Sequence, residues 1–312
     1  MATVKPLRLA SGRDILGLAQ MAAGWLLTAF LPQKLIQRVA RALAALHLLI
    51  FPGAVRKGVS RVRCLMDPAP NDADLVCLFR EHHKRTYEHL LGRILDTHRR
   101  GWHPQIDLEG VEHVRHSLGQ SRGVIFWGMS FCGPVIPKAG LFQAGFRVVH
   151  LSIPFHGGFS KSWVARRLLN PWTLRSENKY LAERLVIPPD GSLNYLRTLK
   201  QRLRDNGCVS IMGEHKGIQN VGVPFLSEQR EFATGAPNLA RSTGAALLTV
   251  YSHRIAPFHY RVVIEPPIAV DCFTGRAEYI KGAIEQFAQR LTHQIRMHPE
   301  DWEGWSAPEI AA

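Results

Sequence analysis

The sequence predicts an α/β protein: a layered mixed, mostly parallel sheet flanked by helices and preceded by helices that associate with a membrane. Two observations predict the sheet, namely short apolar runs typical of buried strands and longer helix-like stretches that alternate with them. A third, an apolar and basic amino-terminal region, predicts the membrane-associating helices. The 312 residues are enough for a sizeable core.

The amino-terminal region combines apolar stretches with basic residues. Residues 15–33 carry no charge and approach the shortest length that spans the roughly 30 Å core of a bilayer. A second uncharged stretch, 42–55, is too short to cross. Between and after these stretches lie Lys34, Arg38, Arg41, Arg56, Lys57, Arg61 and Arg63. We expect attachment to an anionic leaflet by one marginal span or by interfacial helices, with a buried core helix as the alternative.

The following elements are predicted from periodicity and turn residues. Residues 74–100 place apolar side chains three and four apart, which predicts a helix. The turn-forming residues 67–72 precede it, so we divide the chain into membrane-associating helices (1–70) and an α/β domain (71–312). Strands are predicted at 123–127, 146–152, 185–187, 208–212, 246–251 and 260–264. Helices are predicted at 134–144, 160–169, 193–204, 236–242 and 277–296.

Charge and cysteine usage narrow the function classes. The 39 Lys and Arg exceed the 25 Asp and Glu, and the net charge of +14 predicts an anionic partner. The basic residues are scattered and no nucleic-acid-binding motif accompanies them, so we expect a membrane lipid and no nucleic acid. Five dispersed cysteines without a Cys-x-x-Cys pair predict a reducing compartment. The absence of a His-Glu-x-x-His pattern predicts no metal site.

Residues 123–135 (GVIFWGMSFCGPV) have the setting of an active site without its usual residues. A short apolar strand ends at Gly128, a tight turn follows, and Pro134 opens a helix. Such a turn places small polar side chains at the carboxyl end of a sheet, where α/β proteins bind ligands. However, this stretch contains no histidine, aspartate or glutamate.

Residues 207–254 carry an ordered series of short motifs. The series consists of Gly207, Glu214, Val223-Pro224-Phe225, Thr234-Gly235 with Leu239-Ala240, and Thr243-Gly244-Ala245. It resembles the second half of the bacterial lipid A late acyltransferases, the lauroyl/myristoyl branch of the lysophospholipid acyltransferase superfamily. Weaker elements in family order extend the resemblance over roughly residues 15–305. The resemblance implies transfer of a fatty acyl chain from acyl carrier protein (ACP) or acyl-CoA to a lipid hydroxyl, without a cofactor, at the cytoplasmic face of a bacterial inner membrane.

Members of this family catalyse with a His-x-x-x-x-Asp/Glu dyad that follows a strand. The histidine takes the proton of the acceptor hydroxyl, and the carboxylate orients the imidazole. Aligned with this pattern, Ser130 stands at the histidine position and Val135 at the carboxylate position. Serine is no base near neutral pH and valine orients none, so this turn cannot perform acyl transfer by the family dyad.

Two chemical replacements for the dyad remain open. The dyad spacing also occurs at His83/Glu88 and His298/Glu303, which we predict to be surface residues. Alternatively, Ser130 is a nucleophile on an incomplete nucleophile elbow, and Cys132 is a weaker candidate thiolate. A serine nucleophile needs a base in space, for which the sequence offers His150, His156, His215 and His253.

A third possibility is a site that binds without catalysis. In relatives, an acidic residue at the Glu214 position and arginines around the cleft serve the acceptor head group or the donor phosphopantetheine. By resemblance, Glu214, Arg166, Arg167, Arg241 and Arg254 are the candidates here, with a strand-end cap or solvated charge as the alternative for each. We therefore expect acyl transfer with a substituted dyad, in which Ser130 and Glu214 are the catalytic candidates. The alternative is a non-catalytic homologue that binds acyl chains or anionic lipid, or supports a partner enzyme.

Overall fold

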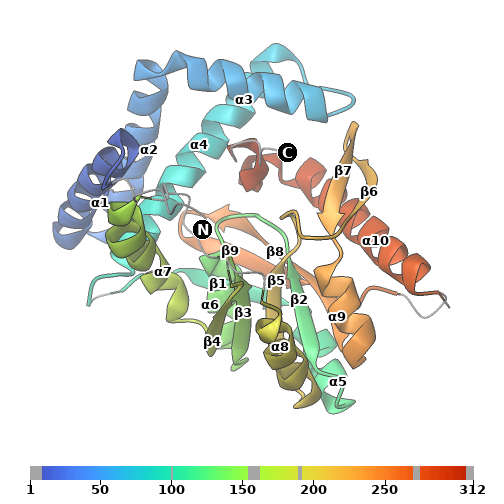
Figure 1. Ribbon diagram of the computed structural model, residues 1–312. Coiled ribbons are helices and arrows are strands. Elements are labelled where there is room, and N and C mark those ends of the chain that lie inside the picture. The colour runs from blue at the N-terminus through green and yellow to red at the C-terminus, as the bar shows by residue number, and fades with distance from the viewer. Residues whose placement is uncertain (1–8, 100, 154–161, 189–191, 270–274, 307–312) are drawn as a thin grey trace, which may run out of the picture.

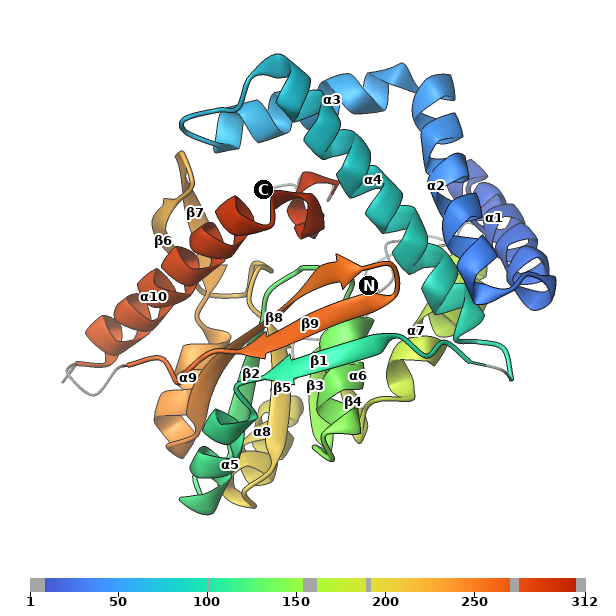
Figure 2. The ribbon, with the colours of Figure 1, turned by 180° about the vertical axis from the view of Figure 1, so that it is seen from behind.

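A seven-stranded sheet forms the centre of the protein, and helices cover both of its faces (Figures 1 and 2). The structure, a computed structural model, describes residues 9–99, 101–153, 162–188, 192–269 and 275–306. The strand order is β1-β9-β8-β2-β5-β3-β4. These strands are β1 (Gln105–Glu109), β2 (Val124–Gly128), β3 (Val148–Ser152), β4 (Glu183–Val186), β5 (Cys208–Met212), β8 (Ala246–Ala256) and β9 (His259–Ile264).

The sheet is mixed but mostly parallel, as predicted. Only β8 and β9 pair antiparallel among its described strands, because a tight turn joins them directly. Strand β2 lies in the middle, where Ile125 pairs with Val209 of β5 and with Leu247 of β8. A separate antiparallel hairpin consists of β6 (Asn220–Phe225) and β7 (Glu228–Ala233).

Alternation along the buried strands divides the core into two layers. Ile125 and Trp127 of β2 pack with side chains of α8, α9 and α10, whereas Val124 and Phe126 pack with side chains of α6. Both faces of β2 are buried because parallel strands joined by helical crossovers are covered on each side. The helices of the α/β part are α5 (Val111–Gly119), α6 (Val135–Gln143), α7 (Asn170–Asn178), α8 (Asn194–Arg204), α9 (Gly235–Thr243) and α10 (Arg276–Met297). Shorter helical turns are η1 (Ala165–Leu169), η2 (Pro299–Asp301) and η3 (Glu303–Trp305).

The amino-terminal helices pack along α4 rather than on the sheet (Figure 1). The three helices that pack on α4 (Asp72–Leu95) are α1 (Gly12–Phe30), α2 (Gln33–Ile50) and α3 (Pro52–Leu65). Ser11 begins α1 with a capping box, since its hydroxyl accepts from the Asp14 N–H and the Asp14 carboxylate accepts from the Ser11 N–H. Gly58 lets α3 approach α4, because a Cβ there would lie 2.0 Å from the Phe79 ring.

None of the described helices is by itself both long and apolar enough to cross a bilayer. Helices α2 and α3 meet that requirement only as a pair, and the pair is bent by 95°. The predicted domain boundary near residue 70 falls in the connection between α3 and α4 and stays a prediction.

Most predicted elements of the α/β part are present within a few residues of their expected ends. The strand predicted at 208–212 matches β5 over its whole length, and β8 runs five residues past its predicted end. Five elements were missed, namely β1, α5, α7 and the two strands of the β6–β7 hairpin. The helix predicted at 160–169 is represented by η1, and its first two residues lie outside the described part of the chain.

Candidate functional site

The turn after β2 lies at the carboxyl end of the central parallel strands, as predicted. Its Met129 N–H donates to the Val250 carbonyl at 2.8 Å, which carries the β2–β8 ladder one residue further. Cys132 and Gly133 then adopt left-handed backbone angles, with φ of 51° and 79°. These two residues reverse the chain so that α6 begins immediately at Val135.

The structure brings Ser130 and Glu214 together through the backbone of the serine. The Ser130 N–H donates to Glu214 Oε1 at 2.5 Å, and the Trp302 indole N–H donates to Glu214 Oε2 at 2.8 Å. The Ser130 carbonyl accepts from the Glu303 N–H at 2.9 Å. Glu214 is buried, and each of its two oxygens accepts a hydrogen bond.

No base reaches the Ser130 hydroxyl within the described part of the chain. None of the hydrogen bonds formed there involves Ser130 Oγ, so the serine-nucleophile hypothesis lacks its histidine partner. Val135, at the position aligned with the dyad carboxylate, is 1 % exposed and packs in the apolar layer beneath α6. The turn therefore provides backbone hydrogen bonds but no acid–base pair.

Cys132 is not a reactive thiol in this environment. Its side chain is buried, and burial together with the nearby Asp301 carboxylate raises its pKa well above the ordinary value. Its N–H donates to the Asp301 carbonyl at 3.1 Å, which makes Cys132 part of the turn's attachment to the carboxy-terminal segment. The hypothesis of a Cys132 thiolate is therefore wrong.

The two His/acid pairs with dyad spacing are not the surface residues that we predicted. Glu88 is 1 % exposed and forms an ion pair with Arg254 at 3.0 Å, and His83 contacts the His47 ring at 3.0 Å. The cause is that α4 lies between the amino-terminal helices and the carboxy-terminal segment, so several of its faces are covered.

The second pair also lies in a packed region. His298 is half-buried and stacks on His253 with ring centroids 4.2 Å apart. Burial, with a further contribution from His298, lowers the pKa of His253 to about 4. Burial also raises the pKa of Glu303. Neither histidine lines the large pocket described below.

The four predicted substrate arginines lie in three different places. Arg166 and Arg167 are exposed on η1. The Arg254 side chain is turned inward, where Glu88 neutralises its charge. The backbone N–H of Arg254 donates to Asp301 Oδ2 at 3.0 Å. Arg241, on α9, is the one of the four that lines the large pocket.

A pocket of about 960 Å³ opens between the carboxyl ends of β3 and β5 and helices α8 and α9. Its walls are largely apolar, with contributions from Leu151, Ile211, Leu196, Leu199 and Leu239. Cationic and imidazole side chains also line it: His215, Lys216, Lys200, Arg241 and Arg276. A large apolar cavity with a few polar groups is the usual form of a site for a small molecule or a lipid chain.

A second, closed polar cluster lies on the opposite face of the sheet. Lys138 of α6 forms an ion pair with Glu177 of α7, which also pairs with Arg184 of β4. The Lys138 Nζ lies 3.3 Å from His150 Nε2, and His150 Nδ1 lies 3.1 Å from Ser210 Oγ. Burial lowers the pKa of Lys138, while Glu177 opposes that shift.

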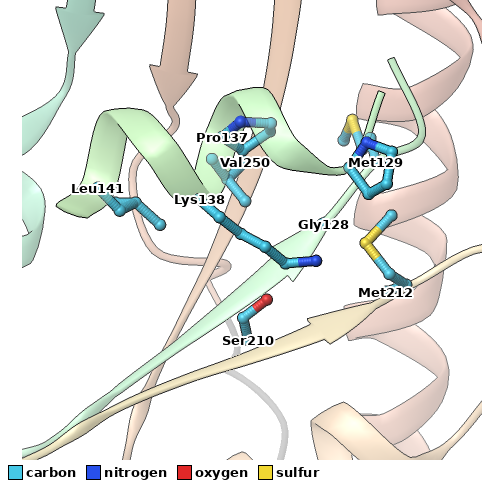
Figure 3. A pocket seen from close by; sticks show the side chains of 9 residues that line it. Gly128, Met129, Pro137, Lys138, Leu141, Ser210, Met212 and Val250 are labelled. Atoms are coloured by element: carbon cyan, nitrogen blue, oxygen red, sulfur yellow. The ribbon is translucent and has the colours of Figure 1, made fainter. Parts of the chain in front are cut away.

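Lys138 and Ser210 face one another across a small cavity of about 20 Å³ (Figure 3). That volume suits a single water molecule and no substrate group. His150, a predicted base for Ser130, is therefore enclosed by this cluster instead. His156, another predicted base, lies outside the described residues.

Sequence reasoning missed the residues that hold the site together. Trp302 was not among the predicted site residues, although its indole is fully buried against Glu214. Lys138 lies 39 positions before Glu177, and Arg184 follows Glu177 on the next element. A lysine within an otherwise apolar helix was the one available signal for this cluster.

Comparison with known proteins supports the resemblance noted in the sequence. Residues 166–305 match the family described as bacterial lipid A biosynthesis acyltransferase, a segment that includes Glu214 and begins after Ser130 and Val135. No curated protein matches the chain. Among solved structures, the chain is similar to the 1-acyl-sn-glycerophosphate (LPA) acyltransferase PlsC from Thermotoga maritima. That similarity has 13 % identity and a TM-score of 0.35 over 91 % of this chain and 99 % of the other, which is too loose to bear on function.

Proposed function

We propose that this chain, whose residues 166–305 match the bacterial lipid A biosynthesis acyltransferase family, transfers a fatty acyl chain to the hydroxyl group of a lipid. The observation that carries the proposal is the pocket of about 960 Å³ at the carboxyl ends of β3 and β5. Its leucine- and isoleucine-rich walls suit a fatty acyl chain, because burying each methylene contributes about 0.8 kcal/mol.

The charges around the pocket support an acyl donor that carries phosphate. Lys200 and Arg241 line the pocket, and neither has an acidic partner within the part of the chain that the structure describes. Lys216 pairs with Glu231 at 3.5 Å, and Arg276 donates to Asn238 Oδ1 at 2.9 Å. Unpaired cations attract phosphate, which both acyl-ACP and acyl-CoA carry at the end of the pantetheine arm opposite the thioester.

The surface of α1 and α2 supports attachment to a membrane. Large apolar side chains are exposed along both helices, among them Ile15, Leu16, Leu26, Phe30, Leu46, Leu49, Ile50 and Phe51. On α2, Leu46, Leu49 and Ile50 recur three and four residues apart and therefore share one face. The next helix, α3, carries basic residues, so these helices suit an anionic leaflet. We place the protein at the cytoplasmic face of a bacterial inner membrane.

A specific observation favours a second candidate function, acyl binding without transfer. Both oxygens of Glu214 are occupied by Ser130 and Trp302, and Ser130 Oγ has no base among the described residues. On this alternative, the pocket holds an acyl chain or anionic lipid, or presents it to a partner enzyme.

One experiment separates the two functions. The purified protein is incubated with radiolabelled myristoyl-ACP or myristoyl-CoA and a panel of lysolipid and lipid A precursor acceptors, and acylated lipid is separated by thin-layer chromatography. Binding of the acyl donor is measured in parallel. Acylation of an acceptor above a heat-treated control supports transfer. Donor binding without any acylation overturns transfer and leaves the binding function.

A further inference from the structure

Acyl transfer needs a group that takes the proton of the acceptor hydroxyl. Ser130 and Val135 supply none at the dyad positions. Glu214 supplies none either, because one of its oxygens accepts the Ser130 N–H and the other accepts the Trp302 indole N–H. The base must therefore stand elsewhere on the wall of the acyl pocket, within hydrogen-bond reach of the acceptor.

Two histidines of the described residues line that pocket, His150 and His215. The ring of His150 is 1 % exposed and lies between Ser210 and Lys138, on the side of the sheet that α6 covers. The pocket lies on the other side, beneath α8 and α9. His215 instead follows β5 directly and is half-buried, so its ring is accessible from the pocket.

The turn after β2 fixes the position of His215 through Glu214, the residue that precedes His215. The side chain of Glu214 is held on one side by the Ser130 N–H and on the other by Trp302. Its carbonyl oxygen accepts from Arg230 Nη2 at 3.3 Å, and the Arg230 guanidinium lies over the Phe225 ring at 4.8 Å. With side chain and carbonyl both held, the backbone entering His215 is rigid, as a catalytic position requires.

We infer that His215 is the general base of acyl transfer in this chain, an inference that rests on the proposed function. His215 takes the proton of the acceptor hydroxyl while the hydroxyl oxygen attacks the carbonyl carbon of the acyl thioester. The carbon–sulfur bond breaks, and the imidazolium returns the proton to the leaving thiolate. The products are the lipid ester and the free thiol. Glu214, Ser130 and Trp302 act as positioning residues.

The test compares His215→Gln with His116→Gln, a control at an exposed position on α5 outside the pocket. For His215→Gln we expect kcat to fall about 100-fold or more, with the KM for the acyl donor within about threefold. The acidic limb of the wild-type pH–rate profile is lost in this variant. Added imidazole restores part of the activity of His215→Ala. His116→Gln behaves as the wild type.

A ligand-binding readout accompanies the kinetics. The ring resonance of His215, assigned by its loss in His215→Gln, shifts when myristoyl-CoA is added, and that of His116 does not. If the wild type transfers acyl chains and His215→Gln retains its rate, the assignment of His215 is overturned while acyl transfer stands. If the wild type binds the donor but transfers no acyl chain, both the proposed acyl transfer and the assignment of His215 as its base are overturned. A bound donor that leaves the His215 resonance unmoved also overturns the assignment.

Discussion

The backbone N–H of Ser130 lies 2.5 Å from Glu214 Oε1, so the turn after β2 is tied to the loop after β5. In the resembled pattern, the serine position carries the catalytic histidine, whose side chain does the chemistry. In this chain the same position contributes its backbone instead. The carboxylate that it binds also accepts the Trp302 indole N–H, which connects both strand ends to the carboxy-terminal segment.

Glu214→Gln tests this connection. A glutamine has one acceptor oxygen and one amide nitrogen, so either the Ser130 N–H or the Trp302 indole faces a donor. We expect the free energy of unfolding to fall by about 1–3 kcal/mol, measured by urea denaturation. The control Glu231→Gln removes a partly exposed carboxylate that pairs with Lys216, and should change stability by no more than about 0.5 kcal/mol. Equal stabilities of the two variants would contradict the role of Glu214.

The sheet could be predicted from the sequence, whereas much of the site could not. Buried parallel strands such as β2 and β5 leave continuous apolar runs bounded by turn residues. By contrast, β1 (Gln105–Glu109) alternates polar and apolar residues at a sheet edge, and resembles a loop in composition. The sequence also predicted a turn at Ser130 and Val135 without an acid–base pair, and the described residues there form none. The contact of Trp302 with Glu214 could not be predicted, because it joins residues 88 positions apart along the chain.

The stability of the protein should fall as the pH drops from about 6.5 to about 4. Burial lowers the pKa of His82 to about 4, although the hydrogen bond to the Glu300 carbonyl and the nearby Asp301 carboxylate oppose the shift. As a neutral ring, His82 donates to the Glu300 carbonyl and accepts from the Ser306 hydroxyl. In this window the unfolded chain binds more protons than the folded chain at this site. His82 thus removes up to about 3 kcal/mol of stability on acidification.

His82→Gln should therefore reduce, without abolishing, the dependence of the free energy of unfolding on pH between 4 and 6.5, because burial also lowers the pKa of His83, His89 and His253 to about 4. Urea denaturation at closely spaced pH values measures this slope, whatever the absolute stability of the variant. His116→Gln, at an exposed position, should keep the wild-type slope. An unchanged slope in His82→Gln would show that His82 does not titrate in the way proposed.

Filling the large pocket should shorten the acyl chain that the protein accepts. Leu196 of α8 lines the pocket, so Leu196→Trp places a larger ring in the volume proposed for the chain. We expect weaker binding of long-chain acyl donors and a smaller effect on short-chain donors, measured over a series of acyl-CoA lengths. Arg197→Trp is the matched control, because the next residue of the same helix is exposed and does not line the pocket. An equal loss at all chain lengths would argue against acyl binding in this pocket.

The exposed face of α2 should govern attachment to membranes. Leu49→Glu with Leu46→Glu places two negative charges among exposed apolar residues, and should release the protein from vesicles that contain anionic lipid. The matched control is Met297→Glu, which adds a charge at an exposed apolar residue at the end of α10. Flotation of each variant with vesicles measures the bound fraction. Release by Met297→Glu to the same extent would point to net charge instead of this face.

Glu177 should be more important for stability than Lys138, although the two form one buried ion pair. Glu177 lies between Lys138 and Arg184, so Glu177→Gln leaves two enclosed cations without their counter-charge. Removing one partner of a buried pair typically costs about 3–5 kcal/mol. Lys138→Met leaves Glu177 paired with Arg184 and removes an amine whose pKa burial already lowers, so its cost should be less than half as large. Urea denaturation of the two variants gives the comparison, and equal losses would mean that Arg184 does not share the charge of Glu177.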